Sequence, residues 1–154
     1  METISSFLAR DHDRLDDLFR SFQSAKATDL SRARHAFSAF KIGLQRHIVW
    51  EEDMLFSIFE ERTGSVDAGP TAVMRLEHRR IKDLLEDIQD RLGRGEIDTK
   101  EQEAALLSVL GTHNAKEEGV LYPWFDRSLS EDLVRDLLRR MRDLPEDRFH
   151  RCCA

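Results

Sequence analysis

Hydrophobic residues recur every three or four positions along most of the chain, which is the spacing of one face of an α-helix. These stripes predict helices over about residues 4–24, 30–61 and 71–92, and a fourth that begins near residue 100. Glycine and proline mark the breaks between them, at Gly64, at Gly69-Pro70 and at Gly93. Strand-like alternation is not seen, so the pattern predicts an all-α protein.

Long helices joined by short loops favour an up-down-up-down four-helix bundle, which we place at residues 1–127. Ser128-Leu129-Ser130-Glu131 is typical of a helix start, so residues 128–144 are expected to form a short C-terminal fifth helix packed on the bundle. Residues 145–154 show no periodicity and are expected to be a flexible tail. For Cys152 and Cys153 in this tail, soft-metal binding or thiol exchange is the alternative to having no role.

Each of the four long stripes is interrupted by side chains that can bind metals. In the first helix one such residue stands between Leu8 and Leu15, and in the third one stands between Met74 and Ile81. The second and fourth helices each have two, four residues apart. The interrupting residues are His12 in the first helix, His47 and Glu51 in the second, His78 in the third, and His113 and Glu117 in the fourth.

Two carboxylates in one apolar core need a compensating cation, because an unpaired buried carboxylate is costly or becomes protonated. Residues four apart share a helix face, so His47 and Glu51 can face one centre, and His113 and Glu117 can do the same. A single histidine on an apolar face is more often an ordinary core residue. Six such residues at matching depths favour a metal site.

The chain also repeats itself with an offset of 66 residues, which relates His12 to His78 and His47 to His113. A pseudo-two-fold bundle follows, and it predicts two metals, each with two histidines and both bridged by Glu51 and Glu117. Mixed imidazole and carboxylate ligands suit iron, with manganese or zinc as alternatives. We expect two non-haem iron ions with an oxo or hydroxo bridge, and an open position for a small ligand.

Charge and composition exclude some classes of partner. The net charge is −6 and the acidic and basic residues are interspersed, which argues against nucleic acid. A secretory signal is not evident, and no stretch approaches the ~20 apolar residues of a membrane span. Adjacent cysteines cannot staple a fold, so we expect a reduced, cytoplasmic protein. The oligomeric state is left open.

These motifs resemble those of the hemerythrin-like proteins, the HHE cation-binding group. The resemblance covers about residues 4–126 and rests on His12, His47-x-x-x-Glu51-Glu52, Glu77-His78, and His113-x-x-x-Glu117-Glu118 followed by Leu121-Tyr122-Pro123. It implies a four-helix bundle around a non-haem di-iron centre, with the six residues named above as the iron ligands. It also implies a diatomic or peroxide ligand.

The chain departs from the oxygen-carrying hemerythrins, which have two histidines four residues apart on the third helix. Here the positions around His78 are Met74 and Lys82. His113 pairs best with Glu117, and Glu118 is the alternative ligand. These departures argue against simple oxygen carriage and favour redox chemistry or sensing.

The favoured function is therefore a reaction with oxygen, peroxide or nitric oxide in the response to oxidative or nitrosative stress. A peroxide- or nitric-oxide-consuming enzyme is included in this hypothesis. The alternatives are reversible oxygen binding or sensing, and an iron storage or repair module without catalysis.

The residues around the proposed ligands are assigned simpler roles. Glu52 and Glu118 are expected at the surface, with contacts to the ligands as the alternative. Asp11 belongs to an acidic run that is expected to be solvated, with orientation of a histidine as the alternative. Core packing accounts for Phe56 and Tyr122, although they could also shape a dry pocket.

Overall fold

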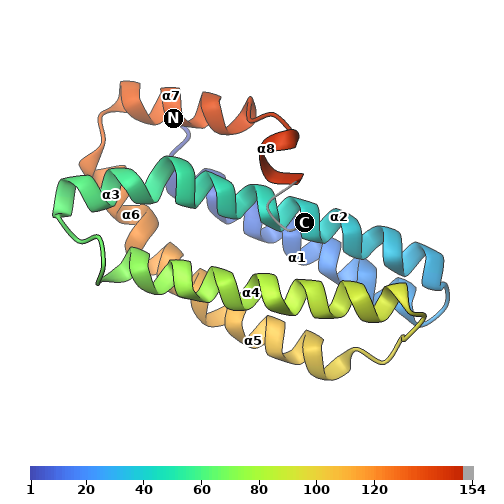
Figure 1. Ribbon diagram of the computed structural model, residues 1–154. Coiled ribbons are helices and arrows are strands. Elements are labelled where there is room, and N and C mark those ends of the chain that lie inside the picture. Colours follow the sequence, from blue (N-terminus) through green and yellow to red (C-terminus); the bar gives the residue numbers. More distant parts are fainter. Residues whose placement is uncertain (151–154) are drawn as a thin grey trace.

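The computed structural model describes residues 1–150, which form helices and loops without a strand. Four long helical runs lie side by side, and the loops between successive runs lie at alternating ends of the molecule (Figure 1). The runs are α1 (Ile4–Lys26); α2 (Leu30–Val49), η1 (Trp50–Leu55) and α3 (Phe56–Thr63); α4 (Pro70–Gly93); and α5 (Lys100–Lys116), η2 (Glu117–Leu121) and α6 (Tyr122–Ser128). The predicted all-α fold is confirmed. Among the described helices, none is both long and apolar enough to cross a membrane.

Local sequence determines where most of these helices begin and end. The Thr3 side chain accepts a hydrogen bond from the backbone N–H of Ser6 at the start of α1, and Asp29 caps α2 in the same way. Gly64 ends α3 with a φ of 71°, a conformation that favours glycine. Thr99 precedes α5 but does not cap it with its side chain, because its hydroxyl donates to the buried Glu103 carboxylate at 2.6 Å.

The C-terminal helix α7 (Glu131–Arg142) packs over one end of the bundle (Figure 1). Trp50 fixes its last turn by donating a hydrogen bond from Nε1 to the carbonyl oxygen of Met141 at 2.9 Å. The expected flexible tail needs correction, because α8 (Asp147–His150) follows and packs on α2. The cause is the buried aromatic side chain of Phe149, which gives this short turn an apolar anchor. Residues 151–154, including Cys152 and Cys153, lie outside the described residues.

The core consists of two apolar clusters separated by a polar layer. One cluster lies near α7 and contains Leu8, whereas the other lies toward the α1–α2 turn and contains Leu15. His12 falls between these two leucines on α1, and His78 falls between Met74 and Ile81 on α4 in the same way. The bundle therefore holds its buried histidines at one level, with apolar packing above and below.

Candidate metal centre

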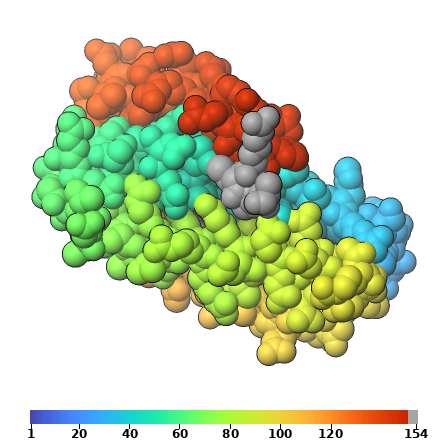
Figure 2. Space-filling model, viewed as in Figure 1, coloured from blue at the N-terminus to red at the C-terminus, as the bar shows by residue number. Residues whose placement is uncertain are grey.

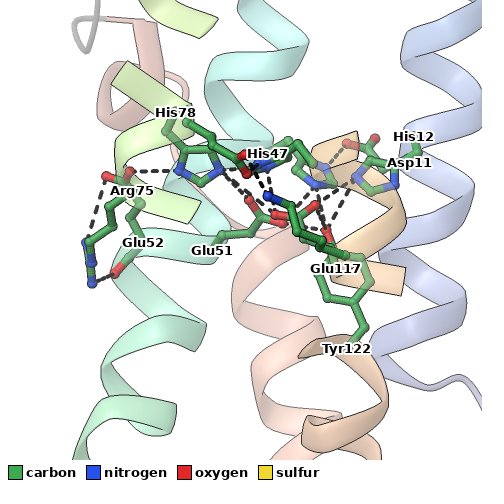
Figure 3. Close-up of polar contacts among 12 residues, drawn as sticks. Asp11, His12, His47, Glu51, Glu52, Arg75, His78, Glu117 and Tyr122 are labelled. Atoms are coloured by element: carbon green, nitrogen blue, oxygen red, sulfur yellow. Dashed lines mark hydrogen bonds and ion pairs between the residues drawn. The ribbon is translucent and has the colours of Figure 1, made fainter. Parts of the chain in front are cut away.

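The polar layer brings together all six side chains that interrupt the apolar stripes (Figure 3). They form two groups in which one ligand atom of each residue lies within 4.8 Å of those of the others. The first cluster is His12, His47, Glu51 and Glu117, and the second cluster is Glu51, His78, His113 and Glu117. Glu51 and Glu117 belong to both clusters and are 0% exposed.

Each shared glutamate directs one carboxylate oxygen to each cluster. Glu51 Oε1 lies 3.2 Å from His47 Nε2 in the first cluster, and Glu51 Oε2 lies 3.0 Å from His78 Nε2 in the second. Glu117 Oε2 lies 3.4 Å from His12 Nε2, and Glu117 Oε1 lies 2.8 Å from His113 Nε2. This division of the four oxygens is what two bridging carboxylates require.

The donor set fits a pair of metal ions. Bonds of about 2.0–2.2 Å put two ligands of one metal at most about 4.4 Å apart, close to the separations within each cluster. Glu51 Oε2 and Glu117 Oε1 are buried and lack a hydrogen-bond partner of acceptable geometry, although an imidazole nitrogen is close to each. Buried carboxylate oxygens without a donor favour a cation at this place.

Four further carboxylates hold the outer nitrogens of the histidines. His47 Nδ1 lies 2.8 Å from Asp11, and His113 Nδ1 lies 3.0 Å from Glu77, its counterpart 66 residues later. The other two pairs are His78 with Glu52 at 2.8 Å and His12 with Glu118 at 2.7 Å. Metal-binding histidines commonly make such a contact, which fixes the ring and leaves Nε2 for the metal.

The charges of the layer oppose the effect of burial. Burial lowers the pKa of His47, but Glu51 and Asp11 raise it to about 10. Burial likewise lowers the pKa of His78, while Glu51 and Glu52 raise it to about 9. For Glu51, burial raises the pKa, but the two imidazoles hold it well below its ordinary value. Protons therefore occupy the layer of the metal-free protein at neutral pH, and a metal would displace them.

A π-helical turn follows each proposed glutamate ligand. The backbone N–H of Phe56 bonds to the carbonyl of Glu51, and that of Tyr122 bonds to the carbonyl of Glu117, five residues earlier in both cases. Single π-helical turns are rare and often occur at functional sites. The wider turn brings the fifth residue beneath the glutamate, whereas at 3.6 residues per turn it would point about 140° away.

The two residues at this position differ, and only one is polar. The Tyr122 hydroxyl donates to Glu51 Oε1 and lies 2.8 Å from Glu117 Oε2. It also lies 3.2 Å from His47 Nε2 and 3.3 Å from His12 Nε2, so it sits inside the first cluster (Figure 3). Phe56 instead stacks its ring on His78, with centroids 5.8 Å apart. Burial, Glu117 and Glu51 raise the pKa of Tyr122 well above its usual value, so its proton is retained at neutral pH.

The comparison with protein families agrees with this geometry. The model of the hemerythrin HHE cation-binding domain matches residues 3–125, most of the chain. The chain belongs to the hemerythrin HHE family. Membership of this family, together with the two buried histidine–glutamate clusters, indicates a metal cofactor. Among curated proteins and solved structures, none matches the chain.

Several features of this HHE domain differ from the sequence-based expectations. Glu118 is exposed, as expected of a surface residue, whereas Glu52 is half-buried. Both also contact histidines from outside the two clusters, which was the alternative. Glu118 faces His12 Nδ1 rather than a cluster, which does not favour it as a ligand in place of Glu117. Asp11 is buried and orients His47, as the alternative expected.

Two further residues, Glu77 and Tyr122, have contacts with the clusters that the sequence did not predict. Glu77 was quoted only as part of the Glu77-His78 motif and was given no role, although its place 66 residues after Asp11 was a usable signal. Tyr122 could not be distinguished from a packing residue, because no α-helical spacing places it beside Glu117.

Proposed function

We propose that this HHE-family protein is an up-down-up-down four-helix bundle that holds two non-haem iron ions and reacts with oxygen, peroxide or nitric oxide in oxidative or nitrosative stress. His12 and His47 would hold one ion, His78 and His113 the other, and Glu51 and Glu117 would bridge both. The observation that carries the proposal is the division of the four carboxylate oxygens between two pairs of histidines. Carboxylate bridges and imidazole ligands suit a redox-active pair.

When bound, an iron pair supplies electron exchange with small oxygen or nitrogen ligands. The chain's own residues then determine proton supply and access. Tyr122 holds a proton on its hydroxyl oxygen 2.8 Å from Glu117 Oε2, inside the first cluster. The rings of Phe56 and Tyr122, both 0% exposed, cover the layer on the α7 side and keep bulk water from it. The second cluster lacks a phenol at the matching position, so proton supply differs between the two sides.

Among the three substrates, peroxide demands least from other components. Two molecules of hydrogen peroxide give one molecule of oxygen and two of water, so one peroxide supplies the electrons that the other accepts. The oxidised peroxide releases two protons and two electrons, and the reduced peroxide takes up all of them to give two water molecules. A buried hydroxyl that can donate and accept a proton fits this exchange.

The test uses full-length protein purified from iron-replete cells. Metal analysis should give two iron ions per chain, and addition of peroxide should release one oxygen molecule for every two peroxides consumed. One metal or none per chain would contradict the di-iron proposal. Retention of both irons without oxygen release, but with reversible binding of oxygen by the reduced protein, would instead indicate carriage or sensing. Ready loss of iron to a chelator, with neither response, would indicate storage or repair.

A further inference from the structure

A pocket rich in arginine lies next to the polar layer, on the side of α1 and α2 that α7 covers. Its volume is about 320 Å³, and it is lined by Phe7, Arg10, Asp11, Arg14, Arg46, Trp50 and Arg142. An adjoining hollow of about 350 Å³ shares Arg14, Arg46 and Arg142 with it. Four arginines therefore converge from three helical elements in a chain whose net charge is −6.

The carboxylates near the pocket do not balance these arginines. Glu2 pairs with both Arg10 and Arg142, and Asp11 pairs with Arg14 at 2.8 Å. Arg46 reaches Asp11 only at 3.6 Å, and its Nε atom is buried without a hydrogen-bond partner. Four guanidinium groups against these two carboxylates leave a formal charge of +2, and Glu146, which lines the adjoining hollow, lowers it to +1. A net positive charge favours an anion at this place.

Packing holds two of the arginines in fixed positions. The Arg46 guanidinium lies over the Trp50 ring at 4.7 Å, and that of Arg142 lies over Phe7 at 5.3 Å. Gly43 leaves room for the Arg14 side chain, because a Cβ atom there would lie 3.1 Å from an Arg14 terminal nitrogen. Guanidinium groups held in this way lose little freedom when an oxyanion binds, and they can each offer two parallel N–H donors.

We propose that this arginine pocket binds a small phosphate-type oxyanion, either free phosphate or the phosphate group of a small monoester. Arg142 and Arg46 are its principal donors, and Arg10 and Arg14 complete the positive lining. Glu2 occupies part of the site in the anion-free protein by pairing with Arg10 and Arg142. The pocket is separate from the polar layer, and binding of the oxyanion does not require the metals.

Asp11 gives the pocket a direct connection to the first cluster. One oxygen of Asp11 faces Arg14 and Arg46, and the other lies 2.8 Å from His47 Nδ1. An oxyanion that engages the two arginines competes with Asp11 for them. Occupancy of the pocket therefore alters the side chain that orients His47, and it makes the first cluster the one that responds to the anion.

The test is isothermal titration of the metal-free, full-length protein with inorganic phosphate at constant ionic strength, and then with adenosine monophosphate. Saturable binding of one phosphate is expected. Arg142→Gln and Arg46→Gln should each weaken it by roughly tenfold or more, the loss expected for a charge-assisted bidentate contact. Tighter binding of the nucleotide would assign the site to a monoester, and equal or weaker binding would assign it to the free anion.

Two further variants provide controls. Arg80→Gln removes an exposed arginine at the position 66 residues after Arg14 and should leave phosphate binding unchanged. Glu2→Gln frees Arg10 and Arg142 and should strengthen binding, a gain that loss of folding cannot produce. Absence of saturable binding would overturn the proposal. Binding that is equally strong in Arg142→Gln, or that occurs only after iron is loaded and persists in that variant, would also overturn it and would place the anion elsewhere.

Discussion

The first and second clusters are built from matched parts, but they differ at one position. Each has two histidines, shares Glu51 and Glu117, and has an outer carboxylate for each imidazole. The first cluster contains the Tyr122 hydroxyl, whereas Phe56 stacks on a ring of the second. The matched parts are those needed to hold metals, and the unmatched part is the one that can move a proton. The proposed di-iron centre therefore gives both sides the same part in holding metal and a different part in proton transfer.

The outer faces of the two halves differ in the same way. On the α1–α2 side, Phe7 and Arg10 line the arginine pocket beneath α7. The residues 66 positions later, Val73 and Leu76 on α4, are exposed. Figure 2 shows α4, in yellow-green, on the open surface of the molecule, whereas α7, in orange, lies along the opposite side. A repeat that kept its inner layer has thus acquired different surroundings on its two sides.

Loss of a shared ligand should have the largest effect, because it acts on both clusters at once. Glu51→Gln keeps the size of the side chain but removes the bridging charge, and it should abolish binding of both metals. His113→Ala removes a ligand of the second cluster only, so one metal per chain should remain. Metal analysis after dialysis measures both, with circular dichroism as the check on folding. Equal metal loss in the two variants would contradict the shared role of Glu51.

The second effect is the dependence of metal binding on pH. The pKa values of about 10 for His47 and about 9 for His78 lie above 7, so both imidazoles are protonated in the metal-free protein and must release a proton. Affinity should rise by about tenfold per proton and per pH unit between pH 7 and 9. It should level off above about pH 10.

The raised pKa of His47 has the opposite effect on the stability of the metal-free protein, which should fall as the pH rises. Because the folded pKa of His47 exceeds 6.5, its stabilising contribution is complete below pH 6.5 and is lost as the pH rises through about 10. The stabilisation gained on adding metal should therefore increase with pH. Calorimetric zinc titrations in two buffers of different ionisation enthalpy measure the number of protons released. Release of no protons would contradict the protonation of His47 and His78 in the metal-free protein.

Substitution of Tyr122 by Phe removes the phenol from the first cluster, and substitution of Phe56 by Tyr places one beside the second. Tyr122→Phe makes the first cluster like the second and should lower peroxide consumption by about 100-fold, the low end for loss of a proton donor. It should retain both metals and lose only about 1 kcal/mol of stability, because the ring still fills its site. Phe56→Tyr in this background is the matched test, and recovery of activity there would show that either side can use a phenol. Full activity of Tyr122→Phe would contradict its role.

The outer carboxylates should give the smallest differences. Asp11→Asn should weaken metal binding at the first cluster by roughly tenfold, the usual cost of losing such a contact. Glu77→Gln should cost less at the second cluster, because the Glu77 side chain is 22% exposed and that of Asp11 only 7%. Water replaces a lost contact more easily at the exposed position. Competition of each variant with a metal chelator measures the two affinities, and a larger loss in Glu77→Gln would reverse the expected order.

The sequence was sufficient for the helices and for the six buried residues because both follow from α-helical periodicity. Periodicity fails where the helix changes its pitch. Val120 stands three residues after Glu117, a spacing that α-helical periodicity places on the same face, yet it is 63% exposed because it lies within the π-helical turn. The same turn carries Tyr122 into the layer. Contacts between helices, such as Asp11 with His47, also depend on packing that no single helix pattern contains.

The most direct test of a di-iron centre bridged by Glu51 and Glu117 is a crystal structure of the iron-loaded protein, with anomalous scattering measured at the iron absorption edge. Two iron peaks are expected in each chain, one beside His12 and His47 and the other beside His78 and His113. Glu51 and Glu117 should bridge them, and the Tyr122 hydroxyl should lie next to the first peak only. A single peak, or two peaks that do not share the glutamates, would contradict the proposed di-iron centre.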